Sequence, residues 1–305
     1  MFIAPIDLTV AEATAFALHR LNEHPVVEFR KPDFSKHQLD PSVTAVVVSL
    51  YYLHYDIAEA LAISKQARSM GIAFFAVIDS VNVSWMFSDF GGSHIVDAHT
   101  PPLKRDERTG EREALTNKIE EFEFCDFSTY VTSPVNEKYW MTKPSFPSDV
   151  FLFVHFYLKF RSVQRPMDKD PSPKRTRRDD RNFAAFIEEQ LAEASKLSPR
   201  VSKFLGKRTG AEFAAHLIQV YETQLTVPSS PHMAAIHGAL VTQELIKFVT
   251  KRDPPLVNSL VIHNEECSAI VVKQPASLSS KIISSGHEDK DDIEIVTGGK
   301  DVVLD

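Results

Sequence analysis

The sequence predicts an α/β fold built on an open, largely parallel sheet, and three observations support this class. Short β-branched runs alternate with a helical pattern between residues 26 and 78, as in buried strands that helices connect. The chain has only ten glycines, and none has the spacing with which backbone amides approach a phosphate. Residues 1–25, which precede the first strand-like run, contain no glycine. The fold is therefore expected to lack the glycine-rich strand–turn–helix unit that usually opens such a sheet.

The elements follow from periodicity, from length and from the residues that end each run. The helix expected at 54–69, for example, is ended by Gly71 and places six residues on or beside one apolar stripe: Ile57, Ala60, Leu61, Ile63, Ser64 and Ala67. Strands are expected at 26–29, 44–50, 72–79, 128–133, 259–263 and 269–273, with two more within 83–96 around Gly91 and Gly92. Further helices are expected at 150–161, 182–196, 211–225 and 233–250.

Composition divides the chain into one domain and a tail. Residues 1–274 are predicted to form the domain, interrupted by a charged excursion at 99–127 and a solvated, proline-bearing linker at 167–181. Residues 275–305 become serine-rich and then acidic, so this tail is predicted to be disordered.

Charge and cysteine content exclude several functions. The net charge of −7 disfavours nucleic-acid binding, and no apolar run is long enough to span a bilayer. Two cysteines without a CxxC motif argue against a zinc site and a disulfide framework. Both Cys125 and Cys267 stand among acidic residues, which raise a thiol pKa, so neither is expected to be a nucleophile. The sequence predicts a soluble protein of a reducing, intracellular compartment that binds no metal.

Two segments carry a resemblance to a known family. Residues 71–99 and 232–272 resemble the small, non-catalytic subunit of the SUMO-activating enzyme, a member of the ThiF/ubiquitin-activating-enzyme-like family, and weaker matches at 130–140 and 151–161 lie between them. The matching residues of the first segment are Asp79, Phe87, Gly92, His94 and Val96. Those of the second are Gly238, Gln243, Glu244, Lys247, Arg252, Asp253, Pro254, Pro255 and Asn258. The resemblance covers residues 12–273.

This resemblance implies an incomplete Rossmann-like adenylation fold of the ThiF type and a regulatory role in protein sumoylation, in nucleus and cytoplasm. A larger catalytic subunit would be the partner; it would bind ATP and Mg²⁺, adenylate the modifier and carry the thioester cysteine, so this chain itself would bind no cofactor. The family's small subunit opens with a helix bearing an arginine that reaches the partner's ATP, followed by a glycine-rich unit. Neither matches here, so either this part of the chain is missing or the subunit lends no arginine. No catalytic residue of its own is expected.

The resemblance names candidate interface or structural residues, which are Asp79, Gly238, Gln243, Glu244, Arg252 and Asp253. In the helix at 233–250, Ile236, Leu240, Leu245, Phe248 and Val249 are expected near one face, as a core helix requires, with small residues that permit close packing. The RDPP run is expected to end this helix and direct the next strand.

Two further motifs leave alternatives open. The basic run at 173–178 is typical either of a nuclear-import signal or of a plain solvated loop. In the tail, an acidic run beside Ile293, Ile295 and Val296 resembles a SUMO-interaction motif. The alternative functions are therefore a free-standing SUMO-binding or partner-binding protein, or an accessory subunit for another modifier such as NEDD8.

Overall fold

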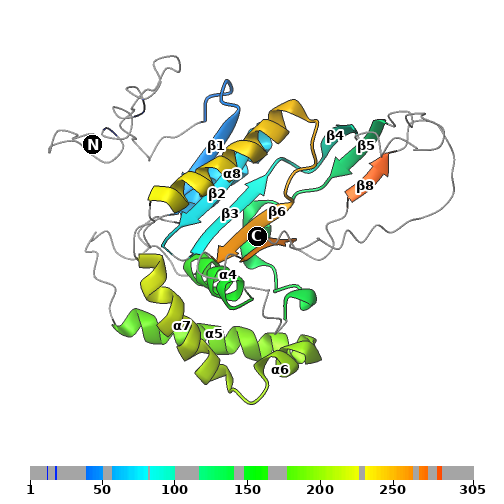
Figure 1. Ribbon diagram of the computed structural model, residues 1–305. Coiled ribbons are helices and arrows are strands. Elements are labelled where there is room, and N and C mark those ends of the chain that lie inside the picture. Colours follow the sequence, from blue (N-terminus) through cyan, green and yellow to red (C-terminus); the bar gives the residue numbers. More distant parts are fainter. Residues whose placement is uncertain are drawn as a thin grey trace, which may run out of the picture. The chain divides into compact units, whose positions relative to one another are not determined.

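The computed structural model describes residues 12, 18, 39–50, 57–81, 83–99, 117–140, 148–163, 177–226, 231–263, 268–273 and 280–283 (Figure 1). The chain divides into two units, Met1–Leu39 and Asp40–Asp305. In the first unit, Glu12 and Leu18 are helical. All of the described strands belong to the second unit, and the strand predicted at 26–29 lies outside the described residues.

A mixed five-stranded sheet forms the centre of the second unit. Its strands are β1 (Ala45–Ser49), β2 (Ala73–Asp79), β3 (Val83–Asp89), β6 (Asn258–His263) and β7 (Ser268–Val272), in the order β1-β2-β3-β6-β7. Only β1 and β2 are parallel, joined by helix α2 (Ile57–Ser69), whereas the other neighbours are antiparallel. The α/β class is thus confirmed, but the expected parallel sheet is limited to one pair, because the short connection from β2 to β3 permits only an antiparallel hairpin.

Helices cover both faces of this sheet. Helix α8 (Pro231–Thr250) lies on the face that carries Phe75 and Met86 (Figure 1). On the opposite face, the rings of Phe74 and Phe87 pack against Phe127 of helix α3 (Phe127–Thr132), and helix α4 (Ser148–Val163) covers α3. Since successive strand side chains point to opposite faces, each run such as AFFAVID fills two cores at once.

Helix α3 lies where a strand is predicted at 128–133, and that prediction is wrong. Asp126 caps the helix: its carboxylate accepts hydrogen bonds from the Thr129 amide at 2.9 Å and from the Thr129 hydroxyl at 2.5 Å. The cap satisfies a free amide of the first turn and overrides the β propensity of the threonine, tyrosine and valine residues that follow.

A second sheet consists of β4 (His94–His99), β5 (Asn117–Phe122) and β8 (Ser280–Ile283), in the order β4-β5-β8. β5 lies in the predicted charged excursion and β8 in the predicted disordered tail, so both predictions miss a strand. Neither strand has a strong pattern of its own, and each is paired with a strand far away in the sequence, as with Ile119 opposite Ile283.

A helical layer packs on α4 and consists of α5 (Arg177–Leu197), α6 (Pro199–Leu205) and α7 (Gly210–Thr226). α5 begins inside the predicted linker at 167–181, and the short α6 is not predicted at all. Ser198 caps α6 by accepting a hydrogen bond from the Arg200 amide at 3.2 Å, and Pro199 is its first residue. A short 3-10 helix, η2 (Glu137–Tyr139), precedes α4.

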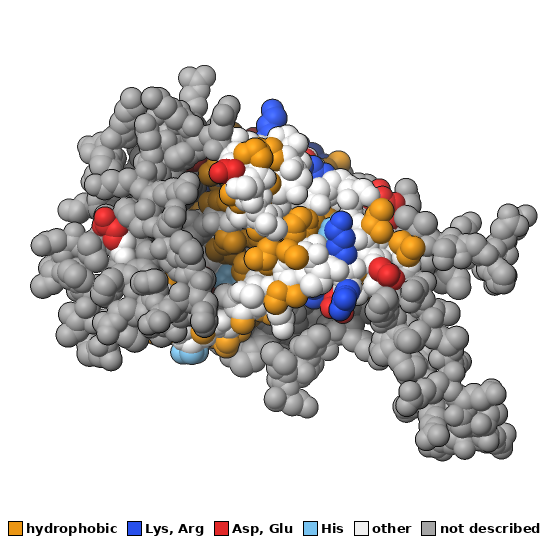
Figure 2. Space-filling model, turned by 90° about the horizontal axis from the view of Figure 1, so that it is seen from above, with side chains coloured by type: hydrophobic (Ala, Val, Ile, Leu, Met, Phe, Trp, Pro, Cys, Tyr) orange, Lys and Arg blue, Asp and Glu red, His pale blue; other side chains and the backbone are white. Residues whose placement is uncertain are grey.

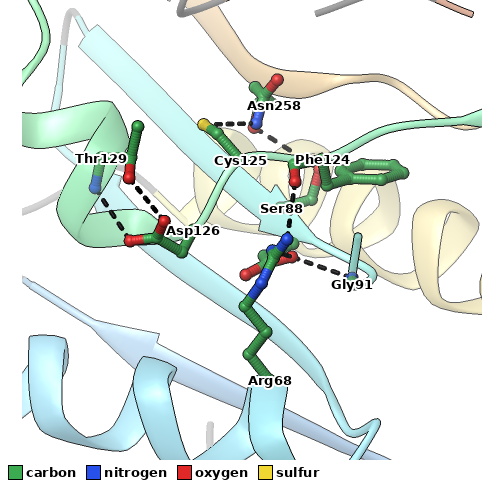
Figure 3. Close-up of polar contacts among 9 residues, drawn as sticks. Arg68, Ser88, Gly91, Phe124, Cys125, Asp126, Thr129 and Asn258 are labelled. Carbon is green, nitrogen blue, oxygen red and sulfur yellow. Dashed lines mark hydrogen bonds and ion pairs between the residues drawn. The ribbon is translucent and has the colours of Figure 1, made fainter. Parts of the chain in front are cut away.

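A partly buried ion pair joins α2 to the end of β3, and its arginine also reaches the segment that follows β5 (Figure 3). Arg68 donates to Asp89 Oδ1 at 2.5 Å and to the Phe124 carbonyl at 2.9 Å. Asp89 Oδ1 also accepts from the Gly91 amide at 2.9 Å, and only 1% of the Asp89 side chain is exposed. Burial raises the pKa of the Asp89 carboxyl, an effect that Arg68 and the Gly91 amide partly offset.

Replacing Arg68 by methionine should lower the free energy of unfolding by about 3–5 kcal/mol at about pH 8, because it leaves a buried carboxylate without its cation. The loss should be smaller at about pH 5, because without Arg68 the pKa of Asp89 rises further and a protonated carboxyl needs no cation. Urea unfolding at both pH values measures this. Lys65→Met, an exposed change on the same helix, is the control and should stay within about 0.5 kcal/mol of the parent. Equal losses for the two variants at the higher pH would contradict the assignment.

Candidate functional site

Within the second of the two segments that carry the resemblance, residues 231–263 form helix α8, a turn at 251–257 and strand β6. α8 packs through Val241, Leu245 and Phe248 against the cluster that includes Phe75 and Met86. The Phe248 ring lies 5.0 Å from that of Phe90 and stacks on His94 at 5.6 Å. These contacts fix the rotation of α8 about its own axis, and therefore decide which of its residues face outward.

The outward face of α8 carries no charge. Its exposed residues are Pro231, His232, Ala234, Ala235, Ile236, Gly238, Ala239, Thr242, Gln243, Ile246, Val249 and Thr250. Ile236 is 50% exposed, Ile246 54% and Val249 59%. Hydrophobic side chains gather on the described surface that faces the viewer in Figure 2. A surface helix normally presents charged and polar residues to water, so this face is typical of a surface that a partner covers.

The prediction that Ile236 and Val249 lie on the core face of this helix is wrong. The helix is apolar on most of its surface, so its sequence is compatible with several rotations, and Phe248 with its neighbours decides between them. A Cβ atom placed on Gly238 would meet nothing within 4 Å. Gly238 therefore does not pack against the described part of the chain, and Ala234, Ala235 and Ala239 are exposed. Sequence reasoning did not identify Ile246 as an exposed residue. The signal that could have identified it is the uncharged series of positions at helical spacing, 236, 239, 243, 246 and 250.

A further exposed apolar residue lies on the edge strand of the central sheet, on the same side of the sheet as α8. Val47 of β1 pairs with Phe75 and is two residues from Ala45, which packs against the α8-side core. Alternation along the strand places Val47 on that same face, where it is 50% exposed.

Gln243 and Glu244 are consecutive residues, and both match the family in the resemblance, but their surroundings differ. Gln243 is exposed, whereas Glu244 is 2% exposed. The Glu244 carboxylate accepts from the Leu256 amide at 2.7 Å and from Lys247 Nζ at 2.6 Å. Glu244 thus fastens the chain that follows α8 back onto the helix.

The RDPP turn serves geometry. Arg252 and Asp253 are exposed and Pro255 is buried. Lys251 ends the helix with φ of 53°, and Asn258 begins β6 with φ of 69°, a conformation that asparagine tolerates better than most residues. The prolines and these two positive φ angles reverse the chain, so that β6 runs back beneath α8.

Asp79 lies at the carboxyl end of β2, where the sequence predicts a hydrogen-bonding residue. The Ser84 hydroxyl donates to Asp79 Oδ1 at 2.7 Å, and His237 Nδ1 of α8 lies 3.7 Å from the same oxygen. Asp79 and His237 therefore link the end of the β2–β3 hairpin to α8. Sequence reasoning does not foresee His237 here, because the two residues are far apart in the chain.

Cys125 is buried, and burial together with the nearby Asp89 and Asp126 carboxylates raises its pKa to about 12. The Asn258 amide donates to its sulfur at 3.0 Å (Figure 3). A thiol in this environment is not a nucleophile at neutral pH. Cys267 lies outside the described residues, as do Ile293, Ile295 and Val296 and the basic run up to residue 176.

The described residues contain no group of three or more His, Cys, Asp or Glu side chains that suits a metal ion. Among the same residues, no helix is both long and apolar enough to cross a membrane. No known family model matches the chain, and no curated protein matches its sequence.

Two buried histidines, His94 beside α8 and His155 in α4, are neutral at pH 7. Burial lowers the pKa of each to about 4, and the positive charges of Lys251 and Lys159 respectively add to the effect. In the unfolded chain both would bind a proton near pH 6.5. Between about pH 6.5 and pH 4 the unfolded state therefore binds more protons, and the folded state loses stability as the pH falls.

His94→Phe should reduce the pH dependence of stability while keeping the ring that packs on Phe248. Loss of one titrating histidine removes up to about 1.4 kcal/mol per pH unit from the slope of the unfolding free energy between about pH 6.5 and pH 4. Urea titrations across this range measure the slope. An unchanged slope would mean that His94 does not titrate differently on folding.

Glu244→Ala should cost about 1–3 kcal/mol, because it leaves the Leu256 amide without an acceptor and Lys247 without its carboxylate. Gln243→Ala, the neighbouring exposed position, is the matched control and should stay within about 0.5 kcal/mol. Thermal and urea unfolding of both variants compare the two costs; equal effects would show that Glu244 does not fasten the turn.

Proposed function

We propose that this chain is the non-catalytic subunit of a heterodimeric, ATP-dependent SUMO-activating enzyme. In this role it supports adenylation and thioester formation by a larger catalytic subunit during protein sumoylation. ATP, Mg²⁺ and the thioester cysteine belong to that larger subunit, and the complex works in the nucleus and cytoplasm.

The observation that carries the proposal is the uncharged outward face of α8. Three large aliphatic residues there, Ile236, Ile246 and Val249, are half exposed or more. Leaving each of them in water forgoes about 1–3 kcal/mol of transfer free energy, which a subunit contact would recover. This face belongs to the segment at 232–272, one of the two that carry the resemblance to the small subunit.

The surrounding structure is consistent with a supporting rather than a chemical role. The helix, turn and strands on which the resemblance rests are α8, the RDPP turn and the β6–β7 hairpin. Glu244, one of the matching residues, is used internally to hold that turn. The described thiol, Cys125, is buried and protonated. What this part of the chain offers a partner is therefore a rigid apolar surface, supported from below by Phe248 and the central sheet.

The full chain should co-purify with the larger SUMO-activating subunit when the two are co-expressed and a tag on this chain is used for capture. The complex should form SUMO adenylate, measured by ATP–pyrophosphate exchange, and a SUMO thioester on the larger subunit. Ile246→Asp should abolish co-purification, because it buries an unpaired charge at the contact. Ala62→Asp, an exposed change on α2, is the control and should not.

The larger subunit for NEDD8, tested in parallel, decides which modifier is served. Selective capture of that subunit would replace SUMO by NEDD8 in the proposal. Capture of neither subunit, with the chain folded, would overturn the heterodimeric function. Binding of free SUMO that is lost when residues 284–305 are deleted would then assign the chain to the independent SUMO-binding proteins.

A further inference from the structure

We propose that the acidic tail segment of this chain, residues 284–305, binds a basic surface of the same chain on and beside helix α6. This basic surface consists of Lys196, Arg200, Lys203, Lys207 and Arg208. The contact covers the basic surface and the acidic residues together, so neither is available to another charged partner. The inference goes beyond the proposed function, because the basic surface belongs to the helical layer and not to α8.

The basic surface is concentrated in thirteen consecutive residues of the helical layer. Residues 196–208 contain five lysine or arginine residues and no aspartate or glutamate. All five are exposed, at the end of α5, on α6 and in the loop before α7 (Figure 1). Since α6 has seven residues, and therefore a length of about 10 Å, these charges lie close together. They form a local positive region on a chain whose net charge is −7.

Helix α6 is held with its charged side toward water. Val201 and Phe204 are buried and form its inner side. Arg200 and Lys203 are three residues apart, so they are neighbours on the helix surface, and both are exposed. In the loop that follows, the Arg208 guanidinium lies 6.0 Å from the centre of the Phe204 ring, which keeps this cation next to α6.

The acidic side chains beside the basic surface already have partners. Glu137 accepts a hydrogen bond from the Ser198 hydroxyl at 3.0 Å and pairs with Arg200 at 3.2 Å. Glu212 accepts a hydrogen bond from the Thr209 amide at 2.7 Å, as part of the cap of α7. Within the part of the chain that the structure describes, four of the five cations form no ion pair: Lys196, Lys203, Lys207 and Arg208. The surface therefore keeps most of its positive charge.

The acidic tail segment supplies charge of the opposite sign in a matching amount. It contains seven acidic and two basic side chains, and five of the acidic ones lie within residues 288–294. No other seven consecutive residues of the sequence contain as many. In extended form this run is about 23 Å long, so it can cover α6 and the cations on both sides of it.

The acidic tail segment is also long enough to reach the basic surface. Glu294 is eleven residues beyond Ile283, the last residue of β8. An extended chain of this length spans about 38 Å. A folded unit of the size of Asp40–Asp305 has a radius of gyration of about 18 Å. The acidic run can therefore extend from the end of β8 across the unit to the helical layer.

The chemistry of the basic surface favours this segment over nucleic acid or an anionic membrane. The net charge of −7 repels both of these polyanions, whereas a tethered segment is held near the surface at a millimolar effective concentration. The aromatic rings beside the surface, Phe204 and Phe213, are buried and offer no face for base stacking. Leu197 is 77% exposed there, and the aliphatic residues Ile293 and Ile295 lie within and beside the acidic run.

A full-length variant with a neutral tail tests the contact. In it, the five acidic residues of 288–294 are replaced by asparagine or glutamine, and binding of a fluorescein-labelled peptide of residues 286–298 is measured by anisotropy at low ionic strength. Five exposed ion pairs give an expected dissociation constant on the order of 0.2 mM. The parent chain should bind the peptide about fivefold more weakly, because its own tail occupies the surface at about 1 mM effective concentration.

Charge reversal locates the contact on the helical layer. Introduced into the neutral-tail variant, Lys203→Glu should raise the dissociation constant of the peptide about tenfold, because it removes one attraction and adds one repulsion. Lys65→Glu is the matched control: it makes the same change of charge at an exposed position of α2 and should leave the binding nearly unchanged. Circular dichroism checks that both variants are folded.

Carbodiimide cross-linking tests whether the contact forms within one chain. This reagent joins a carboxylate to an amine that is in contact with it. At about 1 μM parent chain, mass spectrometry of the monomer should find amide bonds from the acidic residues of 288–294 to Lys196, Lys203 or Lys207. The bonds should be absent from the neutral-tail variant, and about 0.5 M salt should suppress them, because it screens exposed charges.

Equal binding of the peptide to the parent and the neutral-tail variant would overturn the inference. So would cross-links only to other lysines, or equal effects of Lys203→Glu and Lys65→Glu. A labelled single-stranded DNA or an anionic phospholipid vesicle that binds the parent as tightly as the neutral-tail variant would instead assign the surface to that partner. These measurements use no larger subunit. A chain that captures the larger subunit without a tail contact therefore keeps the proposed function and loses this inference, and a tail contact without capture does the reverse.

Discussion

The contact between Arg68 and Asp89 is the interaction on which the arrangement of this protein depends. Arg68 reaches from α2 to the end of β3 and to the Phe124 carbonyl, so one guanidinium holds three segments of the chain. Asp89 in turn holds the Gly91 amide, which turns the chain from the first sheet into the second. Phe90, between Asp89 and Gly91, packs on Phe124 and on Phe248 of α8. It thereby connects the ion pair to the residues that hold α8 in place.

The packing of α8 on the central sheet determines which side of this helix is exposed. This helix is apolar around most of its circumference, and a different rotation would bury Ile236 and Val249 and expose Phe248. The observed rotation is favoured because it buries Phe248, whose ring packs against Phe90 and His94. These aromatic contacts add to the free energy gained by burying apolar surface. Glu244 reinforces this rotation, because only in it does the buried carboxylate accept the hydrogen bond from the Leu256 amide. The uncharged outward face of α8 is thus a consequence of how the inner face of this helix packs.

Matching residues that look equivalent in the sequence divide between two tasks. Glu244, Asp79 and Asn258 are bonded within the chain and hold the frame of the helix, turn and hairpin. Gly238 and Gln243 are exposed and are free to meet a partner. The proposed subunit role uses this second group and leaves the first group unchanged.

The sequence by itself determined the α/β class, the extents of β1, β2, α2, α4, α7 and α8 to within a few residues, and the inert character of Cys125. These depend on local periodicity and on neighbouring residues, which the chain carries wherever it folds. The antiparallel course of β3 and the helical state of α3 follow from local features that the periodicity does not express, the short β2–β3 connection and the Asp126 cap. Only the tertiary structure decided the strands β5 and β8. It also decided which side of α8 faces water. Strand pairing and helix rotation are settled by partners far apart in sequence, as with Ile119 and Ile283 or Phe90 and Phe248, and no local pattern records them.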